Sequence, residues 1–382
     1  MIYRFGKLFE IIDGDRGKNY PKENDFFDDG YCLFLNAGNV TKNGWSFEKN
    51  TFITKEKDEQ LRKGRVSKGN TVLTTRGTVG NVAFYDNKVK FNHVRINSGM
   101  VILKTKNNRI VTDEFIYYLV KSPLVLKTIE LFCSGSAQPQ LPIKDFIRIK
   151  ANIPLLDTQK RVVEMLSVFD CLIEINKKRI KVLEQMAENL YKEWFVRFRF
   201  PGHENAEFEN GIPKGWTYCR LKELFEIKYG KDHKSIAEGE IPIFGSGGIM
   251  RYGDKAIYSN ESVLIPRKGT LNNILYVNEP FWTVDTMFYT ILLKPNFAKY
   301  AYYTLANVDM ESYNSGAALP SMTTDILYHL RILVPDNRTL KLFDEFISDI
   351  NTQKKKIEVI NNNLTKQRDL LLPRLMSGKL EV

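Results

Sequence analysis

Two long segments of the chain carry apolar residues at alternating intervals of three and four positions. The first runs from about Asp157 to Phe200 and the second from about Asp336 to Leu372. This spacing predicts helices with one apolar face, as in a coiled coil. So long an apolar face is costly to expose, and the simplest partner for each helix is the other one. The predicted contact residues are Leu166, Phe169, Ile173, Ile180, Leu183 and Leu190 in the first helix, and Phe346, Ile350, Ile357, Ile360, Leu364 and Leu371 in the second.

Polar residues interrupt both apolar stripes. Asn176 lies in the first stripe, and Gln353 and Gln367 are in register with the second, which is the more polar of the two. A polar residue at such a position can set the register of a helix pair at a cost in stability. The alternative is that each helix packs separately on its own domain. A length near 40 residues favours the pair, because a helix of a single domain rarely needs to be so long.

The ends of the two helices are expected at capping residues and prolines. Asp157 or Thr158 can cap the first helix, and Pro201 with Gly202 is expected to stop it. Pro373 is expected to end the second helix.

The segments before each long helix predict short strands with a few short helices. Two helices are expected, at Thr112 to Val120 with Thr112 as the cap, and at Phe297 to Leu305. Strands are indicated by short β-branched or aromatic runs at Thr71 to Thr75, Asn81 to Tyr85, Gly99 to Lys104 and Met287 to Leu293.

The chain contains an internal repeat. Ser134 to Pro154 aligns without a gap with Ser315 to Pro335, and a long helical pattern follows each final proline. Upstream, KLFEIIDG (Lys7 to Gly14) resembles ELFEIKYG (Glu223 to Gly230), and VLTTRGTVGN (Val72 to Asn81) resembles VLIPRKGTLNN (Val263 to Asn273), with one residue more. Three matches in the same order indicate two copies of one unit, each a globular part followed by a long helix.

Charge and residue usage narrow the class of protein. The 382 residues carry a formal net charge of +11, which suits a polyanionic partner such as nucleic acid, and a merely basic protein is the equally weighted alternative. The N-terminus lacks the pattern of a signal peptide, and no run of about 20 apolar residues predicts a membrane span. The four cysteines and four histidines are scattered, which favours reduced thiols in the cytoplasm and no metal site.

Catalytic motifs are weak or incomplete. Gly64 and Gly69 have the spacing of a phosphate-binding loop, but Asn70 stands where lysine is required. The sequence has no Asn-Pro-Pro-Tyr or Asp-Pro-Pro-Tyr segment for amino methylation, although Phe244 to Gly248 resembles a glycine-rich methyl-donor loop. Glu226-Ile227-Lys228 mimics part of a nuclease site without a nearby upstream aspartate. We therefore predict no catalytic residue, no metal and no cofactor.

Features suited to DNA are more plentiful. Basic side chains neutralise phosphates, while Arg, Asn and Gln can bind base edges with two hydrogen bonds. Arg76 and Arg267 are of particular interest because they occupy similar turns in the two copies. The predicted DNA-binding residues are Arg62, Lys63, Arg65, Lys68, Thr75, Arg76, Thr78, Gln138 and Gln140 in the first copy, and Lys231, Lys234, Ser246, Arg267, Lys268, Asn272 and Asn273 in the second.

The chain as a whole resembles the DNA specificity subunits of type I restriction–modification systems. The resemblance is most specific in PLLDTQKRVVEMLSVFD (Pro154 to Asp170), AENLYKEWFVRFRFPG (Ala187 to Gly202), VLTTRGTVGN, IPIFGSGGI and the tail LLPRLMSGKLEV (Leu371 to Val382). It implies an α+β fold, in which two similar mixed α/β target-recognition domains are joined by two long helices forming an antiparallel coiled coil with a pseudo-two-fold axis. The implied ranges are 1–153 and 201–334 for the recognition domains, and 154–200 and 335–382 for the helices.

The resemblance also implies function. Each recognition domain would read one half of an asymmetric split target in double-stranded DNA. The helices would bind methyltransferase subunits, two in number, and restriction or motor subunits would join through the complex. Two alternatives remain open. An autonomous methyltransferase or nuclease would act on DNA alone, and a coiled-coil scaffold would select no DNA sequence.

Overall fold

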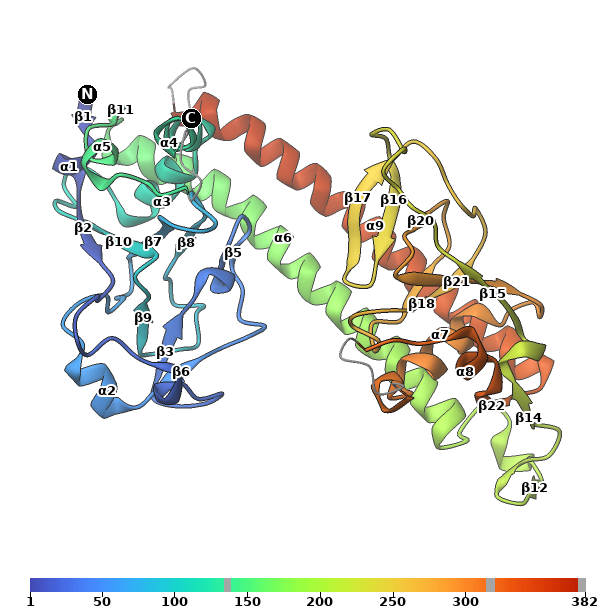
Figure 1. Ribbon diagram of the computed structural model, residues 1–382. Helices are drawn as coiled ribbons and strands as arrows, with labels where there is room; N and C mark the ends of the chain where they lie inside the picture. Colours follow the sequence, from blue (N-terminus) through green and yellow to red (C-terminus); the bar gives the residue numbers. More distant parts are fainter. Residues whose placement is uncertain (134–138, 314–319, 377–382) are drawn as a thin grey trace. The chain divides into compact units, whose positions relative to one another are not determined.

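A computed structural model describes residues 1–133, 139–313 and 320–376 of the chain (Figure 1). The chain divides into two compact units. The first contains Met1–Asn176 and Val359–Val382, and the second contains Lys177–Glu358. Each unit therefore combines one globular part with a stretch of both long helices.

The first unit begins with short strands and ends in a long helix. Its strands are β1 (Ile2–Arg4), β2 (Phe9–Asp13), β3 (Cys32–Leu35), β4 (Val40–Thr41), β5 (Gly44–Trp45), β6 (Phe52–Ile53), β7 (Thr71–Thr74), β8 (Val82–Phe84), β9 (Val94–Ile96), β10 (Met100–Thr105) and β11 (Lys150–Asn152). Its helices are α1 (Phe5–Leu8), α2 (Lys55–Gln60), α3 (Asp113–Lys121), α4 (Pro123–Cys133), α5 (Ile143–Phe146) and the start of α6 (Leu156–Tyr191).

The second unit has a similar order of elements. Its strands are β12 (Phe208–Glu209), β13 (Ile212–Pro213), β14 (Thr217–Arg220), β15 (Phe225–Tyr229), β16 (Ile241–Gly245), β17 (Gly248–Gly253), β18 (Ser262–Pro266), β19 (Leu275–Val277), β20 (Trp282–Thr283), β21 (Met287–Leu292) and β22 (Arg331–Val334). Its helices are α7 (Ala298–Ala306), α8 (Thr324–His329) and the start of α9 (Asn337–Met376).

The two units share one sheet topology. The strand order is β2-β10-β7-β8 in the first unit and β15-β21-β18-β19 in the second, and all neighbours are antiparallel. A three-stranded sheet accompanies each, in the order β6-β3-β9 or β17-β16-β20, with one parallel pair in each. A two-stranded sheet, β1-β11 or β14-β22, adjoins the start of the long helix. The predicted strands and both predicted short helices are present, and the hydroxyl of Thr112 accepts the Phe115 N–H as a cap.

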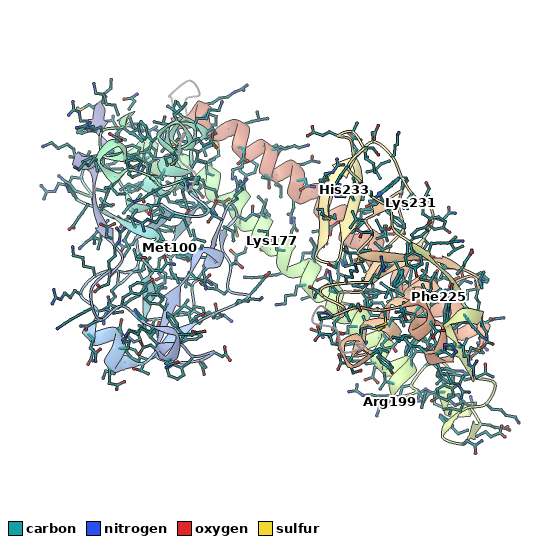
Figure 2. The ribbon with its side chains drawn as sticks, viewed as in Figure 1. Met100, Lys177, Arg199, Phe225, Lys231 and His233 are labelled. Atoms are coloured by element: carbon teal, nitrogen blue, oxygen red, sulfur yellow. The ribbon has the colours of Figure 1, made fainter. Side chains whose placement is uncertain are left out.

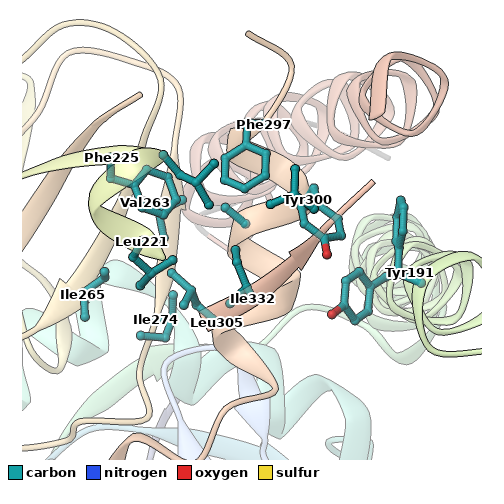
Figure 3. Packing of buried hydrophobic residues seen from close by; sticks show 14 of the residues in the cluster. Tyr191, Leu221, Phe225, Val263, Ile265, Ile274, Phe297, Tyr300, Leu305 and Ile332 are labelled. Atoms are coloured by element: carbon teal, nitrogen blue, oxygen red, sulfur yellow. The ribbon is translucent and has the colours of Figure 1, made fainter. Parts of the chain in front are cut away.

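Each unit buries its own hydrophobic core. In the second unit, Tyr191 of α6 and Tyr300 of α7 lie beside the four-stranded sheet (Figure 3), and Phe343 of α9 belongs to the same core. The ring centroids of Phe195 and Tyr300 lie 4.6 Å apart, and those of Phe195 and Phe343 lie 4.8 Å apart. In the first unit, Val162 and Leu166 of α6 share a core with Leu372 and Leu375 of α9. Burial of these side chains therefore fixes the long helices to the globular parts.

The long helices run antiparallel within each unit. In the first unit, Asp170 of α6 binds Arg368 of α9 at 2.6 Å, while Asn176, further along α6, binds Asn361, which comes earlier in α9. In the second unit, Glu184 lies 2.7 Å from Lys354. Polar residues of α6 are thus paired with polar residues of α9.

The contact face of α9 differs from the predicted stripe. Phe346 is 51% exposed, but its ring still packs against Trp194 in the turn after α6, with centroids 5.8 Å apart. Ile360 is 49% exposed, and Gln353 and Gln367 are exposed as well. Phe343 packs against Tyr191 of α6, and Lys354, Asn361 and Arg368 pair with polar residues of α6. Together with the buried Ile347, Ile357 and Leu375, these positions recur at intervals of three, four or seven residues. The predicted contact residues of α9 were all apolar, so these polar positions were not among them.

The ends of the helices also need correction. Helix α6 begins at Leu156, so Asp157 lies within its first turn, and a π-helical turn at Lys192–Val196 follows it. Helix α9 continues through Pro373 to Met376. A proline removes one helical hydrogen bond, but Leu375 beyond it is only 3% exposed, and its burial favours continued helix. No helix in the described ranges is long and apolar enough to cross a membrane.

Candidate nucleic-acid interface

In the first unit, three loops meet at one end of the four-stranded sheet. They follow β2, follow β7 and precede β10. The Arg16 guanidinium donates to the Ser98 carbonyl at 3.3 Å, and the backbone N–H groups of Thr75 and Arg76 donate to the Gly99 carbonyl at 2.8 and 3.2 Å. The end of β7 thus carries Arg76, which is exposed, beside the Arg16 loop.

The same loops meet in the second unit. The N–H groups of Arg267 and Lys268 donate to the Thr286 carbonyl at 2.8 and 3.3 Å, and the N–H of Lys231 donates to the Thr283 carbonyl at 2.9 Å. Figure 2 labels Lys231 and His233 on the loop that follows β15. We call these two ends of the sheets the first and second loop surfaces.

The structure changes the alignment of the two arginine-bearing turns. Thr74 pairs with Met100, and Pro266 pairs with Met287, which makes Thr74 and Pro266 equivalent. Arg76 therefore corresponds to Lys268, and Thr75 corresponds to Arg267. The glycines that follow, Gly77 and Gly269, both have positive φ values, of 70° and 86°. The two turns align without the extra residue that the sequence comparison suggested.

An isolated β-bridge joins each of these turns to a segment that comes later in the same unit. Arg76 forms an isolated bridge with Gln140, and Lys268 forms one with Ser321. This agrees with the gapless alignment of Ser134 to Pro154 with Ser315 to Pro335. Gln140 is therefore part of the first loop surface, whereas Gln138 lies outside the described residues.

A hollow of about 500 Å³ adjoins the first loop surface and is lined by residues 13–19 together with Gln60, Arg62 and Lys63. Asp15 joins the two sides, since its carboxylate accepts the Gly17 N–H at 2.7 Å and the Arg62 N–H at 2.8 Å. Hydrogen bonds from backbone N–H groups, first that of Gly17, lower the pKa of Asp15. This hollow brings the predicted Arg62 and Lys63 together with Arg16 and Lys18.

A hollow of about 750 Å³ adjoins the second loop surface and is lined by residues 232–234, 245–247, Met250 and 284–286. The predicted Lys234 and Ser246 lie on its wall. The Arg251 guanidinium supports the loop from β17 by donating to the carbonyls of His233 and Ile236 at 2.5 and 3.0 Å.

Arg267 is held in place by its neighbours on the second loop surface. Its guanidinium lies 5.3 Å from the centroid of the Tyr229 ring and donates to the Asp285 carbonyl at 3.2 Å. Cation–π contact and hydrogen bonding together restrict the directions that this side chain can take.

Three predicted residues of the first unit have roles inside the fold. Thr75 is 3% exposed, and its hydroxyl donates to the Gly99 carbonyl at 3.1 Å, so burial removes it from the surface available to DNA. The Lys68 ammonium lies 4.1 Å from the Tyr85 ring centroid and donates to the Val89 carbonyl at 3.0 Å. Thr78 remains exposed, and its carbonyl accepts the hydroxyl of Thr74.

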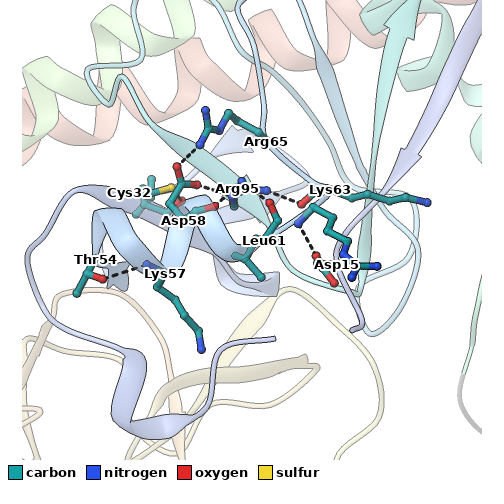
Figure 4. A network of polar contacts seen from close by, with 11 residues as sticks. Asp15, Cys32, Thr54, Lys57, Asp58, Leu61, Lys63, Arg65 and Arg95 are labelled. Atoms are coloured by element: carbon teal, nitrogen blue, oxygen red, sulfur yellow. Dashed lines mark hydrogen bonds and ion pairs between the residues drawn. The ribbon is translucent and has the colours of Figure 1, made fainter. Parts of the chain in front are cut away.

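Arg65, whose side chain is 52% exposed, pairs with a buried carboxylate beneath the first loop surface (Figure 4). The carboxylate of Asp58, which is fully buried, accepts hydrogen bonds from Arg65 and from the buried Arg95. Arg95 also donates to the Lys63 carbonyl at 2.6 Å. The network therefore fixes the backbone that carries Arg62 and Lys63. Burial raises the pKa of the neighbouring Cys32 thiol to about 12.

The two asparagines of the second unit also bind within the fold. Asn272 accepts the Met310 N–H at 2.8 Å, and the Asn273 amide donates to the Ser246 carbonyl at 2.7 Å. Asn81, which is equivalent to Asn273, donates to the Val40 carbonyl at 2.9 Å. An asparagine at this position thus links the turn to the neighbouring sheet in both units.

Several residues of the loop surfaces were missed from the sequence. Arg16 and Lys18 follow the segment KLFEIIDG, and the repeat aligns Lys18 with Lys234. The alignment could therefore have identified Lys18. Tyr229 and Arg251 act through contacts made after folding, and no local pattern marks them.

Comparison with known proteins decides the family. A model of the type I restriction modification DNA specificity domain matches residues 1–185 and 213–362, which is most of the chain. The chain belongs to the type I DNA specificity family. The resemblance found in the sequence is thus confirmed.

Relatives from this family align with most of this chain. The MjaIX specificity subunit of Methanocaldococcus jannaschii is 25% identical over 359 residues, covering 82% of this chain and 78% of that protein. The HindI specificity subunit of Haemophilus influenzae is 21% identical over 456 residues, covering 96% and 98%. Specificity subunits are the non-catalytic DNA-recognition subunits of restriction–modification systems, as predicted for this chain.

Solved structures show the same fold. The S subunit of a type I system from M. genitalium superposes with a TM-score of 0.55 at 17% identity, covering 98% of this chain and 96% of that one. A second chain from a type I system has a TM-score of 0.50 at 16% identity, with coverage of 100% and 98%. The predicted fold class, two similar α/β domains with paired long helices, is confirmed. In the described part of the chain, no group of three or more His, Cys, Asp or Glu side chains is arranged to hold a metal ion.

Proposed function

We propose that this specificity subunit reads an asymmetric, two-part target in double-stranded DNA, with one loop surface for each half. The observation that carries the proposal is the equivalence of Arg76 and Lys268, each a cation on a glycine turn at the corresponding end of the equivalent sheet in its own unit. Such repetition at a surface is not needed to form either core. Basic residues on both loop surfaces suit the phosphates of duplex DNA.

The two halves of the target should differ in sequence. The side chains around the shared cation are different, with Gln140 in the first unit where Ser321 stands in the second. Arg267 occupies the position of the buried Thr75. Arginine suits guanine and glutamine suits adenine in the major groove, so different neighbours favour different bases. Arg62, Lys63 and Lys234 are proposed as phosphate contacts.

We further propose that the long helices dock methyltransferase subunits, two in number. Helix α6 carries apolar residues outside its contact with α9. In the first unit Leu172 and Ile175 are 43% and 47% exposed, and in the second unit Val182 and Met186 are 57% and 53% exposed. Their spacing of three and four residues suits contact with an apolar surface of another protein. The methyl-transfer step belongs to that partner.

Methylation assays on target DNA test this proposal. The purified chain alone should neither methylate nor cut, and addition of the cognate methyltransferase should create methylation. In the assembled enzyme, Arg76→Ala should weaken DNA binding by about 1–3 kcal/mol if the arginine reads a base. If it contacts phosphate alone, affinity should fall for all sequences and the salt slope should decrease by about one. Arg109→Ala, at the other end of β10, is the matched control.

Lys268→Ala should have the corresponding effect on the other half of the target. Lys222→Ala, before β15, is its control. Unchanged DNA affinity in both Arg76→Ala and Lys268→Ala would contradict the assignment of the loop surfaces. Methylation or cleavage by the chain alone, after contaminants are removed, would contradict the assignment as a recognition subunit.

A further inference from the structure

A pocket of about 530 Å³ opens in the second unit between α7, β19 and the long helices. Its wall includes the carboxylates of Glu184 and Glu188 and the rings of Tyr276, Tyr302 and Tyr303. Carboxylates and aromatic faces both attract guanidinium and ammonium groups. The chemistry of this wall therefore suits an organic cation.

The first unit has the same construction at the equivalent place. Helices α3 and α7 each have nine residues and carry adjacent tyrosines, Tyr117 and Tyr118 in one and Tyr302 and Tyr303 in the other. The ring centroids lie 4.9 Å apart within each pair. A strand residue, Phe84 or Tyr276, packs against the first tyrosine at 5.8 or 6.1 Å. The two sites can therefore be compared residue by residue.

In the first unit, two cations of the chain itself occupy this place. The Lys121 ammonium donates to the Tyr117 hydroxyl at 2.7 Å and lies 4.9 Å from the centroid of the same ring. The Arg368 guanidinium binds Asp170 at 2.6 Å and Asp369 at 2.8 Å. Both cations are largely buried, with 11% and 10% of their side chains exposed.

The second unit lacks both cations. Ala306 stands at the position of Lys121, and Ala187 stands at the position of Arg368, by the alignments of α3 with α7 and of α6 with α9. Asn351 replaces Asp170, but Glu188 retains the acid of Asp369. Ala306, Asn351 and Glu188 all line the pocket. The pocket is thus the space that Lys121 and Arg368 fill in the other copy.

The carboxylates of the pocket are already paired with lysines, but they have capacity for more. Lys354 lies 2.7 Å from Glu184, and Lys192 lies 2.5 Å from Glu188. A carboxylate offers about four acceptor positions, so each can accept a further donor. The side chains of Glu184 and Glu188 are 54% and 43% exposed, which leaves them accessible from the pocket mouth.

Lys299 does not make the pocket repel a cation. Its ammonium, in a residue only 7% exposed, lies 2.8 Å from both Glu261 and Asp344. The charge of Lys299 is thus balanced by two carboxylates outside the pocket lining, and Glu184 and Glu188 are the acids that face the pocket.

We infer that this pocket receives an arginine or lysine side chain presented by another protein subunit of the assembly. The identification of that subunit as a methyltransferase rests on the proposed function. Glu184 and Glu188 belong to the same turns of α6 as the exposed Val182 and Met186. A side chain entering beside them would take the place that Lys121 and Arg368 hold in the first unit.

A small probe tests the pocket without any partner. N-acetyl-L-argininamide is titrated into the full chain carrying ¹³C-labelled tyrosine, and the ring signals are followed by NMR. The probe should shift the signals of Tyr276, Tyr302 and Tyr303, and its neutral isostere N-acetyl-L-citrullinamide should not. Glu188→Gln should weaken binding about fivefold or more, whereas the exposed control Glu204→Gln should not. Absence of binding, or equal shifts with the citrulline probe, would overturn the inference.

A lysine of the chain itself, placed in the pocket, tests whether the methyltransferase subunit supplies the cation. Ala306→Lys supplies the cation found in the first unit and should reduce affinity for the methyltransferase subunit about tenfold or more. Thr217→Lys, on the exposed strand β14, adds the same charge elsewhere and should not. Ala306→Arg serves as a second filling variant, and thermal melts establish that each variant is folded. Assembly of both folded variants at parental affinity would refute the inference. If the parent itself does not bind a methyltransferase, the proposed function fails, while the argininamide titration still decides the pocket.

Discussion

The side-chain amide of Asn176 donates a 2.9 Å hydrogen bond to the side-chain oxygen of Asn361 on the antiparallel partner helix. Asn176 is only 8% exposed. Displacing one helix by a turn would separate the two amides and leave polar atoms against apolar neighbours. The pair therefore specifies which residues of α6 and α9 meet.

Replacing one asparagine of this pair should lower the stability of the chain, and replacing both should not. Asn176→Leu alone should destabilise the chain by about 1–3 kcal/mol, because Asn361 loses its partner. The double variant Asn176→Leu/Asn361→Leu should recover that loss or exceed the parent, since apolar residues stabilise a helix contact. Urea denaturation measures both, with the exposed Asn362→Leu as control. A double variant less stable than the single one would contradict this role.

Asp58→Asn should be strongly destabilising. It leaves Arg65 and the buried Arg95 without their carboxylate, and breaking a buried ion pair from one side costs about 3–5 kcal/mol. Asp25→Asn, which removes a surface pair with Lys57 at 3.0 Å, should cost far less, because water screens an exposed pair. Denaturant midpoints compare the two. Equal effects would show that the network under the first loop surface contributes little.

Stability should depend on pH through Lys121. Burial lowers its pKa to about 8, with Arg368 acting in the same direction and Asp170 and Asp369 opposing. The unfolded chain then binds the proton more tightly than the folded chain, so stability should rise as pH increases from about 7.5 to 9.5. Relative to Lys121→Met, the parent should gain about 1–2 kcal/mol over this range. A parallel pH profile for both proteins would contradict the lowered pKa.

Much of the fold could be predicted because it depends on periodicity. The repeat and the lengths of the helices follow from spacing that is visible in the chain. The exact contact face of α9 could not, because Lys354, Asn361 and Arg368 are polar residues that enter it only through partners on α6. Partners distant in sequence leave no local pattern.

The candidate site, like the fold, could be predicted only in part from the sequence. Arg76 and Lys268 were both identified from basic turns, but their equivalence required the strand register. Burial of Thr75 and the use of Arg65 by Asp58 could not be read from charge or residue type. Charge indicates that a surface binds DNA, whereas tertiary contacts decide which side chains remain available for it.

The paired helices should act as a ruler between the two halves of the target. Inserting seven residues into the middle of both α6 and α9 preserves their contact faces and lengthens each helix by about 10 Å. DNA rises about 3.4 Å per base pair, so the preferred spacer should grow by roughly three base pairs, or by less if the helices are inclined to the DNA. Selection of targets with the methyltransferase present measures the spacer. A stable, active variant with the parental spacer would refute the ruler, and altered half-sites would show that the helices help to read bases.

The most direct measurement is a map of methylated bases in genomic DNA from cells that carry this chain with its methyltransferase. We expect a motif of two different defined blocks separated by an unspecified spacer. Lys268→Ala should relax or change one block, and Arg76→Ala the other. A single continuous motif, or the same change from both substitutions, would contradict the claim that each unit reads its own half of the target.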